Sequence, residues 1–313
     1  MEICKELRYN FEGGVKAMEI RVLRYFLAVV REESITKAAE ALHITQPTLS
    51  RQLAQMEEDM GVRLFDRGTR KIVLTNEGIL LRRRAEEILE LVDKTRHELA
   101  AQEEAVEGTV SIGSGDLGAV QILPGIIRSF HEKYPKVNFD FYTATADHIK
   151  ERMDQGLTDV GLLLEPVNME KYEFIRLEKK EQWVAAMHPD SPLAKKESVT
   201  VEDLKGLPLI LPRRLSVQSE LASWFGEDFG KQEVLFTSNL PSNSNIMVHN
   251  RLACALIIKG SITFWDEKKI AYRPLSPELM ASSVLAWKRQ QPFSLAATKF
   301  IEHMKRELEE CRQ

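Results

Sequence analysis

Apolar side chains in the first sixty residues recur at steps of three and four, the spacing of one helix face. Three such runs predict three helices, separated at Glu32–Ser34 and at His43–Ile44. Ser34 and Thr45 are the expected N-caps of the second and third helices, because a short hydroxyl side chain can accept from an unpaired helical N–H. The apolar positions are Leu23, Phe26, Leu27 and Val30; Ile35, Ala38, Ala39 and Leu42; and Leu49, Leu53, Met56 and Met60.

The third helix also has a polar face. At 100° per residue, Pro47 and Arg51 lie far from Leu49, with Ser50 beside them and Gln46 at the N-terminal tip. A short helix, a tight turn and a longer helix of this kind are typical of a helix-turn-helix, whose second helix enters the major groove. Gln can bond adenine, Arg can bond guanine, and Ser suits bases or phosphates. Periodicity alone equally allows an ordinary three-helix core with a solvated polar face.

A basic β-hairpin is expected next. Leu64–Arg67 and Lys71–Thr75 read as two short strands around a tip at Gly68–Arg70. Seven basic and only two acidic residues lie between Gly61 and Arg84, although the whole chain has a formal net charge of −4. Such a patch can bind phosphates while the remaining surface repels them. A basic hairpin beside a recognition helix is a wing, suited to phosphates or the minor groove.

Residues 18 to 78 resemble the N-terminal domain of LysR-type transcriptional regulators. The resemblance is carried by Ala38-Ala39, Thr45–Arg51, Leu64–Arg67 and Leu74-Thr75, and it is nearly free of gaps. It implies that the positions of Gln46, Pro47, Ser50 and Arg51 meet the major groove and that Arg67 and Arg70 lie at the wing. The expected DNA-binding residues are therefore Thr45, Gln46, Pro47, Thr48, Ser50, Arg51, Arg67, Thr69 and Arg70.

Residues 79–107 are expected to form a linker and dimerisation helix. Steps of four and three alternate along it, which gives a narrow heptad seam suited to a partner helix. Packing against its own domain is the alternative, and the resemblance favours the partner. It implies a homodimer, often a dimer of dimers, on a pseudo-palindromic operator in double-stranded DNA, with RNA polymerase as a further protein partner. The seam residues are Leu81, Ala85, Ile88, Val92, Thr95 and Leu99.

From residue 108 onward, strand-like and helical patterns alternate, which predicts an α/β fold with parallel sheets. The expected strands are 109–113, 137–142, 160–164, 183–187, 207–211 and 284–287; the expected helices centre on 126–130, 149–153 and 295–308. This region resembles the family's effector domain, which is similar to periplasmic binding proteins. We therefore expect two doubly wound α/β subdomains, one at about 108–180 with 277–313 and the other at about 181–276, behind an all-α winged helix-turn-helix.

The resemblance places a small-molecule effector in the cleft between the subdomains, although any one of these positions could equally be a turn residue. Hydroxyls, backbone N–H groups and one arginine would suit a small carboxylate or a similar anion. The sequence departs from the family at Asn250–Ala253, where Arg251 replaces a small residue, so pocket shape and ligand charge stay open. The expected cleft residues are Ser114, Gly115, Thr145, Pro212, Arg213, Ser216, Asn239 and His249.

Two other functions have a sequence feature in their favour. Gly113–Gly118 has the G-x-G-x-x-G spacing of an NAD(P)-binding oxidoreductase, with Asp140 about 20 residues later, but Pro124 would break the helix that this motif requires. Cys254 could serve a redox-responsive regulator, yet it lies in an apolar run and is expected to be inert. We expect no catalytic residue, cofactor or metal site, because the seven histidines show no ligand spacing and no G-x-S-x-G occurs.

Composition limits the location of the protein. No apolar run approaches the length of a membrane-spanning helix, and the first residues are too polar for a secretory signal, so we expect a cytoplasmic protein. Three scattered cysteines imply no disulfide framework. Residues 1–17 are expected to be either a non-native extension upstream of a true start at Met18 or a short disordered arm. The intact mass of the product of the native gene distinguishes the two.

Overall fold

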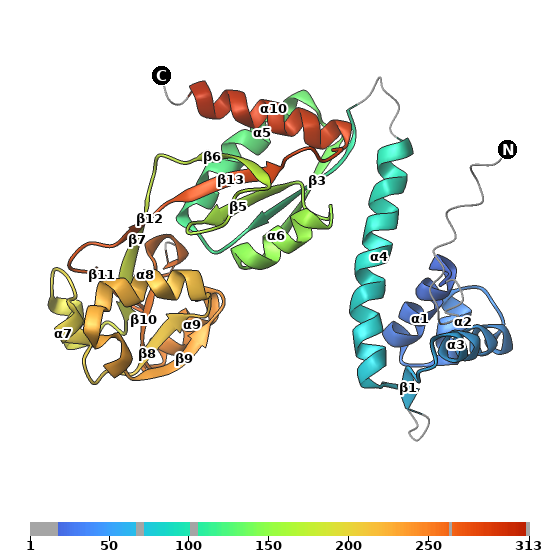
Figure 1. Cartoon of the computed structure of the whole chain (residues 1–313), viewed down its shortest axis with the longest axis horizontal. Helices are drawn as coiled ribbons and strands as arrows, with labels where there is room; N and C mark the ends of the chain where they lie inside the picture. Colours follow the sequence, from blue (N-terminus) through green and yellow to red (C-terminus); the bar gives the residue numbers. More distant parts are fainter. Residues whose placement is uncertain (1–17, 67–71, 101–105, 263–264, 311–313) are drawn as a thin grey trace. The chain divides into compact units, whose positions relative to one another are not determined.

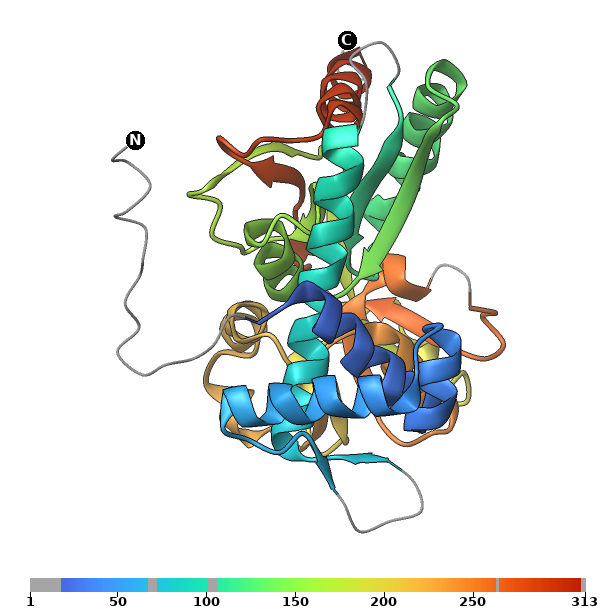
Figure 2. The same ribbon diagram turned by 90° about the vertical axis from the view of Figure 1, so that its right-hand side faces the viewer.

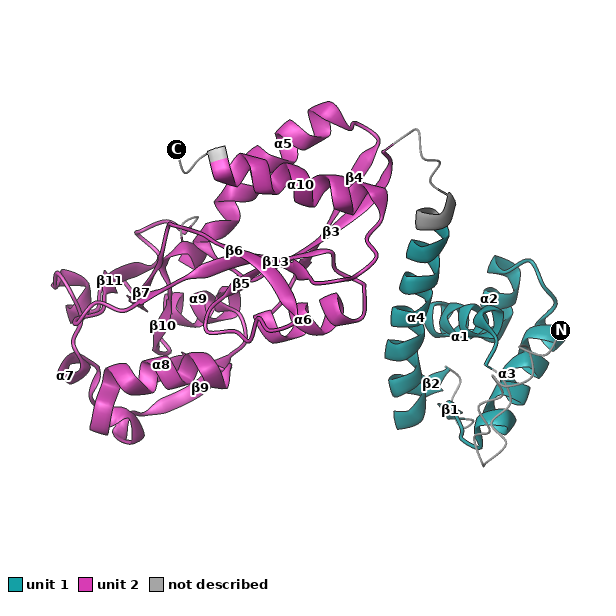
Figure 3. Cartoon of the chain, turned by 45° about the horizontal axis from the view of Figure 1, so that its top comes forward, with its two compact units in different colours: residues 1–96 teal, residues 97–313 magenta. Residues whose placement is uncertain are grey.

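The chain folds into two compact units, residues 1–96 and 97–313 (Figure 3). The structure, a computed structural model, describes residues 18–66, 72–100, 106–262 and 265–310. The extension expected at residues 1–17 and the hairpin residues Arg67, Thr69 and Arg70 lie outside this part of the chain. None of the helices described is both long and apolar enough to cross a bilayer.

Three short helices of unit 1 pack their apolar faces into one core. Phe26, Ala38 and Leu49, one from each helix, are fully buried, as the periodicity predicts. The expected N-caps are also present: Ser34 accepts from the N–H of Lys37, and Thr45 accepts from the N–H of Thr48, each at 3.4 Å. The helices are α1 (Ile20–Glu32), α2 (Ile35–Ala41) and α3 (Gln46–Met60).

A two-stranded hairpin and a long helix complete unit 1. Strand β1 (Phe65–Asp66) pairs antiparallel with β2 (Val73–Leu74), which confirms the predicted strands at the base of the hairpin. Helix α4 (Asn76–Ala100) then continues as one uninterrupted helix (Figures 1 and 2). Its first three turns pack on the core through Leu81 and Ala85.

The first sheet of unit 2 has the strand order β4-β3-β5-β13-β6. Strand β3 runs parallel to β4 and β5, whereas β13 runs antiparallel to β5 and β6. Helices α5 and α10 cover one face and α6 the other (Figure 1), so side chains along β13 alternate between two cores. The strands are β3 (Gly108–Ser114), β4 (Val137–Thr143), β5 (Val160–Leu164), β6 (Tyr172–Arg176) and β13 (Ser283–Lys288), and the helices are η2 (Gly118–Ile122), α5 (Leu123–Lys133), α6 (Ala146–Asp154) and α10 (Leu295–Glu310).

The second sheet has the order β11-β7-β10-β8-β9. Strand β8 runs parallel to β9 and β10, while β7 runs antiparallel to β10 and β11. Its strands are β7 (Glu181–Met187), β8 (Leu209–Pro212), β9 (Val234–Ser238), β10 (Cys254–Ile258) and β11 (Ala271–Pro274), and its helices are η3 (Pro192–Lys195), α7 (Val201–Leu204), α8 (Leu215–Phe225), η4 (Gly226–Lys231), α9 (Pro241–His249) and η5 (Lys259–Ile262). Both sheets are therefore mixed, not purely parallel as expected.

The chain passes between the two sheets twice, and the two passages pair with each other. It leaves β6 for β7 and returns through β12 (Met280–Ala281) to β13. Met280 pairs with Gln182, and Ala281 pairs with Glu181, in an antiparallel ladder. The antiparallel β13 enters the first sheet by this route, because the return passage brings the chain back against the direction of β5. Each sheet with its helices forms one subdomain of unit 2.

Candidate nucleic-acid interface and inter-subdomain pocket

The polar face of α3 is exposed, as the helical periodicity predicts. Gln46, Pro47, Thr48 and Arg51 are exposed and Ser50 is half-buried, while Leu49 is fully buried on the opposite side. In the part of unit 1 that is described, the Arg51 guanidinium has no hydrogen-bond or ion-pair partner. A cationic fork held on a rigid helix and left unpaired can form two parallel hydrogen bonds with a base edge or a phosphate.

The N-terminal end of α3 is fixed by its own side chains. The hydroxyls of Thr45 and Thr48 lie 2.8 Å apart, and the Thr45 hydroxyl also accepts from the N–H of Thr48. Pro47 occupies the first turn, where a missing N–H costs no helical bond. Thr45, an expected DNA-binding residue, thus has a capping role that orders the exposed side chains after it.

The hairpin is anchored at its base by Glu57, which sequence reasoning did not single out, and by Thr75, which it named only as the end of an expected strand and as part of the resemblance. The Glu57 carboxylate of α3 accepts from the N–H groups of Leu64 at 2.7 Å and Phe65 at 3.2 Å. The Thr75 hydroxyl donates to the carbonyl of Arg63 at 2.6 Å and accepts from the N–H of Gly78 at 3.0 Å. These bonds fix both strands relative to α3 and α4, so the base of the hairpin has a defined position beside the exposed helix face.

Helix α4 departs from the expected apolar seam at its first two positions. Leu81 and Ala85, the first two positions assigned to a partner helix, lie in the core of unit 1. Their assignment to the seam is therefore wrong, because α1 to α3 alone do not close the core and α4 supplies its fourth wall. The large apolar side chains that α4 leaves exposed are Ile79, Leu80, Ile88 and Leu91. Val92 is half-buried and Thr95 exposed, and the side chain of Leu99 lies outside the described residues.

A pocket of about 90 Å³ lies between the two subdomains of unit 2. Residues that follow β3 and β4, with two residues of β5, form one wall, and residues of β7, β8 and β10 with the start of α9 form the other. Ligands of open α/β sheets bind at the carboxyl ends of parallel strands, where this pocket lies. Its walls are mainly apolar, and their large apolar side chains are Leu117, Leu162, Leu164, Trp183, Ile210, Leu211, Leu240, Leu256, Ile257 and Ile258.

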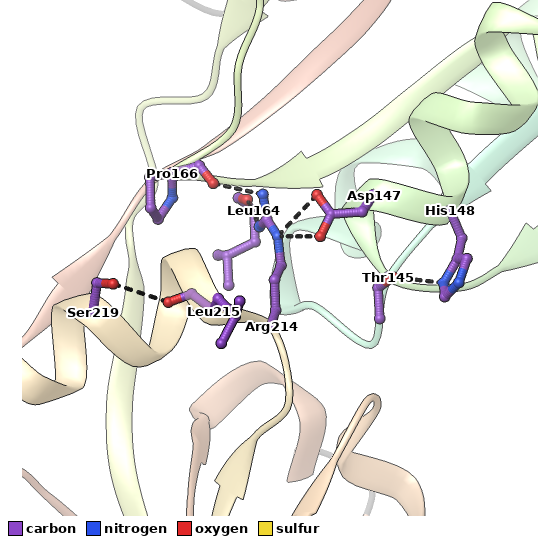
Figure 4. A network of polar contacts seen from close by, with 8 residues as sticks. All are labelled: Thr145, Asp147, His148, Leu164, Pro166, Arg214, Leu215 and Ser219. Carbon is purple, nitrogen blue, oxygen red and sulfur yellow. Dashed lines mark hydrogen bonds and ion pairs between the residues drawn. The ribbon is translucent and has the colours of Figure 1, made fainter.

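Arg214 joins the two subdomains at the rim of this pocket. It lies immediately before α8, and its side chain is only 10% exposed. Its Nη1 donates to the carbonyl of Leu164 at 2.8 Å, its Nη2 donates to the carbonyl of Pro166 at 2.5 Å, and its Nε donates to Asp147 at 3.2 Å (Figure 4). All three partners belong to the other subdomain, so this one side chain connects α8 to β5 and α6.

Two family descriptions match this chain. The "LysR substrate binding domain" covers residues 103–309, and the "Bacterial regulatory helix-turn-helix protein, lysR family" covers residues 20–79. This chain belongs to the LysR family of transcriptional regulators. It is accordingly a DNA-binding regulator and not an enzyme.

Relatives of this LysR-type regulator match it over most of its length. It is 29% identical to the HTH-type transcriptional regulator YvbU of Bacillus subtilis, covering 92% of this chain and 98% of that protein. It is 28% identical to the Hca operon transcriptional activator HcaR of Escherichia coli K12, covering 87% and 92%. The crystal structure of full-length CbnR complexed with its target DNA has a TM-score of 0.69 at 24% identity, covering 92% and 99%. At that identity the likeness shows the fold: a helical helix-turn-helix followed by two mixed α/β sheets.

Half of the expected cleft residues of this LysR-type regulator line the pocket. They are Gly115, Thr145, Pro212 and Asn239. Ser114 is buried beside the pocket, and its hydroxyl donates to the carbonyl of Gly115 at 2.9 Å. Sequence reasoning missed Trp183 and Ser244, which are buried residues of the pocket wall, because a buried strand or helix residue carries no signal of the cavity beside it.

Three expected cleft residues lie elsewhere. Side chains alternate as β8 ends, so Arg213 is exposed and its neighbour Arg214 lines the pocket. On α8, Val217 lines the pocket, whereas the preceding residue, Ser216, does not. His249 ends α9, about 12 Å along the axis from the helix start at the pocket, and contacts His188 and Trp265 instead.

The glycine-rich loop of the regulator is not a nucleotide site. Gly113 lies inside β3, where an added Cβ would stand 2.5 Å from Ile149, so this glycine serves helix packing. The N–H groups that would hold a pyrophosphate are already occupied: Glu181 accepts from the N–H of Ala119 at 2.7 Å and also from Gly118. Burial raises the pKa of the Glu181 carboxyl, and these two N–H groups oppose that rise. The protein thus fills this anion site with its own carboxylate.

Cys254 is buried in β10, and burial raises the pKa of its thiol to about 12. A sulfur that stays protonated is a poor nucleophile and a poor redox sensor. No group of three or more His, Cys, Asp or Glu side chains suited to a metal ion occurs in the described ranges.

Proposed function

We propose that this LysR-type regulator binds a pseudo-palindromic operator as a homodimer, or as a dimer of dimers, and that a small molecule in the inter-subdomain pocket controls it. The exposed face of α3 carries the DNA-binding part of the proposal. Gln46, Ser50 and Arg51 are held on a buried core with their polar groups turned outward, and Arg51 is unpaired among the described residues. The complex of CbnR with its target DNA supports the same use of this fold.

Helix α4 supports the homodimer. Leu80, Ile88 and Leu91 are each 38–53% exposed, and at 100° per residue they lie on one side of the helix, where they form an apolar strip. A two-fold related copy of α4 would cover these three side chains and would place two α3 helices on the two halves of a symmetric site. Sedimentation of the full chain at micromolar concentration tests this, and a monomer would contradict it.

Control by a small molecule follows from the pocket. It separates two subdomains connected by one pair of strands, so its occupant interacts with both. A ligand that binds more tightly at one closure angle of the subdomains than at another shifts the population toward that angle. The size of the shift is set by the difference between the two affinities. Footprinting of the DNA upstream of the native gene, with and without candidate small molecules, tests the proposed function. Absence of any protected site would overturn it.

The contacts of Arg214 hold the two subdomains together beside the pocket and so favour one closure angle. Arg214→Met should therefore allow the subdomains to separate more easily. The substitution keeps much of the side-chain volume but leaves the carbonyls of Leu164 and Pro166 without their donor. Loss of such partners costs about 1–3 kcal/mol. We expect a lower melting temperature and altered operator affinity in the absence of a ligand. Thermal unfolding and footprinting measure the two effects.

The neighbouring arginine provides the matched control. Arg213 carries the same charge one residue earlier but is exposed, so Arg213→Met should change stability by less than about 0.5 kcal/mol. Equal effects of the two substitutions would show that Arg214 does not hold the subdomains together.

Cys254 should not respond to oxidants. A rise in the thiol pKa from 9.0 to about 12 lowers its thiolate fraction at pH 8 by about 1,000-fold, and alkylation of the folded protein should slow by at least that factor. Peptide mapping after iodoacetamide treatment distinguishes Cys254 from the other two cysteines. Modification in urea is the control, and fast modification of the folded chain, or operator affinity that changes with peroxide, would contradict the expectation.

A further inference from the structure

The charged side chains of the inter-subdomain pocket are already paired within the protein. Two charged residues line it, Asp116 and Arg214. Asp116 accepts from the hydroxyl of Ser242, across the mouth of the pocket. Every nitrogen of the Arg214 guanidinium donates to Asp147 or to a backbone carbonyl. A carboxylate ligand would therefore have to displace Asp147 to reach a cation here.

The surroundings of Arg214 are also acidic. Beyond Asp147, the buried carboxyl of Glu220 lies near enough that Arg214 lowers its pKa, against the larger rise caused by burial. Glu165, the next acidic neighbour, raises the pKa of Glu220. Asp147 and Glu220 thus share the Arg214 guanidinium, whereas Glu165 is paired with Arg176, and an incoming anion would meet the repulsion of the first two carboxyl groups at Arg214.

One buried polar group of the pocket wall has no partner. The side chain of Trp183 is 1% exposed, and its indole Nε1–H makes no hydrogen bond within the described residues. A buried donor without an acceptor is unfavourable, so a ligand that supplies one gains affinity at this point. Most of the remaining wall is aliphatic and offers shape and apolar contact.

We propose that this pocket binds a small, uncharged, mainly apolar molecule with one hydrogen-bond acceptor, such as a ketone or an ester, whose oxygen accepts from Trp183 Nε1. This inference rests on the proposed function and replaces the anionic ligand that the sequence suggested. A dry cavity of about 150 Å³ accommodates the six heavy atoms of benzene, so 90 Å³ suits about four heavy atoms in this conformation. A longer ligand must part the subdomains at Arg214, which would connect binding to closure.

Three probes of matched shape, each with four heavy atoms, test the proposal on the full chain: acetone, 2-methylpropene and acetate. We expect acetone to bind about tenfold more tightly than 2-methylpropene, which lacks the acceptor, and the carboxylate to bind most weakly. With ¹⁵N-labelled tryptophan, the Trp183 indole resonance should move downfield with the ketone alone. This measurement needs no variant.

Substitution provides the second readout. Trp183→Phe should abolish the preference for the ketone over the alkene while apolar binding persists. Trp224→Phe should retain that preference, because the Trp224 indole already donates to the carbonyl of Pro277 at 2.7 Å, away from the pocket.

The outcomes separate this inference from the proposed function. Tightest binding of the carboxylate, or an unchanged ketone preference in Trp183→Phe, overturns the ligand class. Absence of binding by all three probes, with footprinting intact, overturns it as well and leaves DNA binding in place. A ketone preference that depends on Trp183 but has no effect on operator affinity supports the ligand class and contradicts the proposed control.

Discussion

Arg51→Ala is expected to lower affinity for the specific operator by about 5- to 150-fold, the value of about 1–3 kcal/mol for one bidentate contact to a base. Arg51 is exposed on α3 and has no competing partner among the described residues, so its donors are available to DNA. Affinity for unrelated DNA should fall much less, since phosphate contacts elsewhere remain. Competition binding with operator and scrambled duplexes at fixed salt measures both.

Substitutions of two other arginines are the controls for this result. Arg21→Ala removes an exposed arginine of α1 that pairs with Glu19 and should leave operator preference unchanged. Arg70→Ala, at the expected wing tip, should weaken all DNA alike and reduce the salt slope by about one, because a phosphate contact carries no sequence information. If Arg51→Ala kept full preference for the operator, α3 would not be the recognition helix.

Gly260→Ala is expected to lower the stability of unit 2 by about 3 kcal/mol or more. A Cβ at residue 260 would lie 2.0 Å from the backbone nitrogen of Gly118 and 2.2 Å from its Cα. Gly118 belongs to the other subdomain and is held by the Glu181 carboxylate, so neither backbone can yield without separating the two. For a unit of this size the change corresponds to a drop in melting temperature of about 6–12 °C.

Gly125→Ala is the matched control. An added Cβ there meets nothing within 4 Å, and residue 125 lies in the first turn of α5. It should be neutral or stabilise by up to about 1 kcal/mol, because alanine restricts the unfolded chain. A Gly260→Ala protein as stable as Gly125→Ala would show that the subdomains are not in close contact at this point.

Local patterns predicted the helical core and its exposed face well. The spacing of Leu49, Leu53 and Met56 identifies which side of α3 is buried, and the hydroxyls of Ser34 and Thr45 mark where two helices begin. These features depend on neighbours three or four residues away, which a sequence displays directly.

Features that depend on packing between residues far apart in the sequence could not be predicted as well. The heptad along α4 could not show that Leu81 and Ala85 complete a core formed by residues up to 60 positions away. Arg213 and Arg214 are adjacent and chemically identical, and only the alternation at the end of β8 decides which one faces the pocket. The antiparallel β13 likewise depends on a return passage that no local pattern reveals.

The ladder between β7 and β12 limits how a bound molecule could act. Two hydrogen-bonded segments side by side resist stretching and sliding but still flex and twist as a ribbon. Bending and twisting of this pair of strands are therefore the movements of the subdomains that the ladder allows most easily. Under the proposed control, a ligand in the pocket would act by changing how far this pair of strands is bent or twisted.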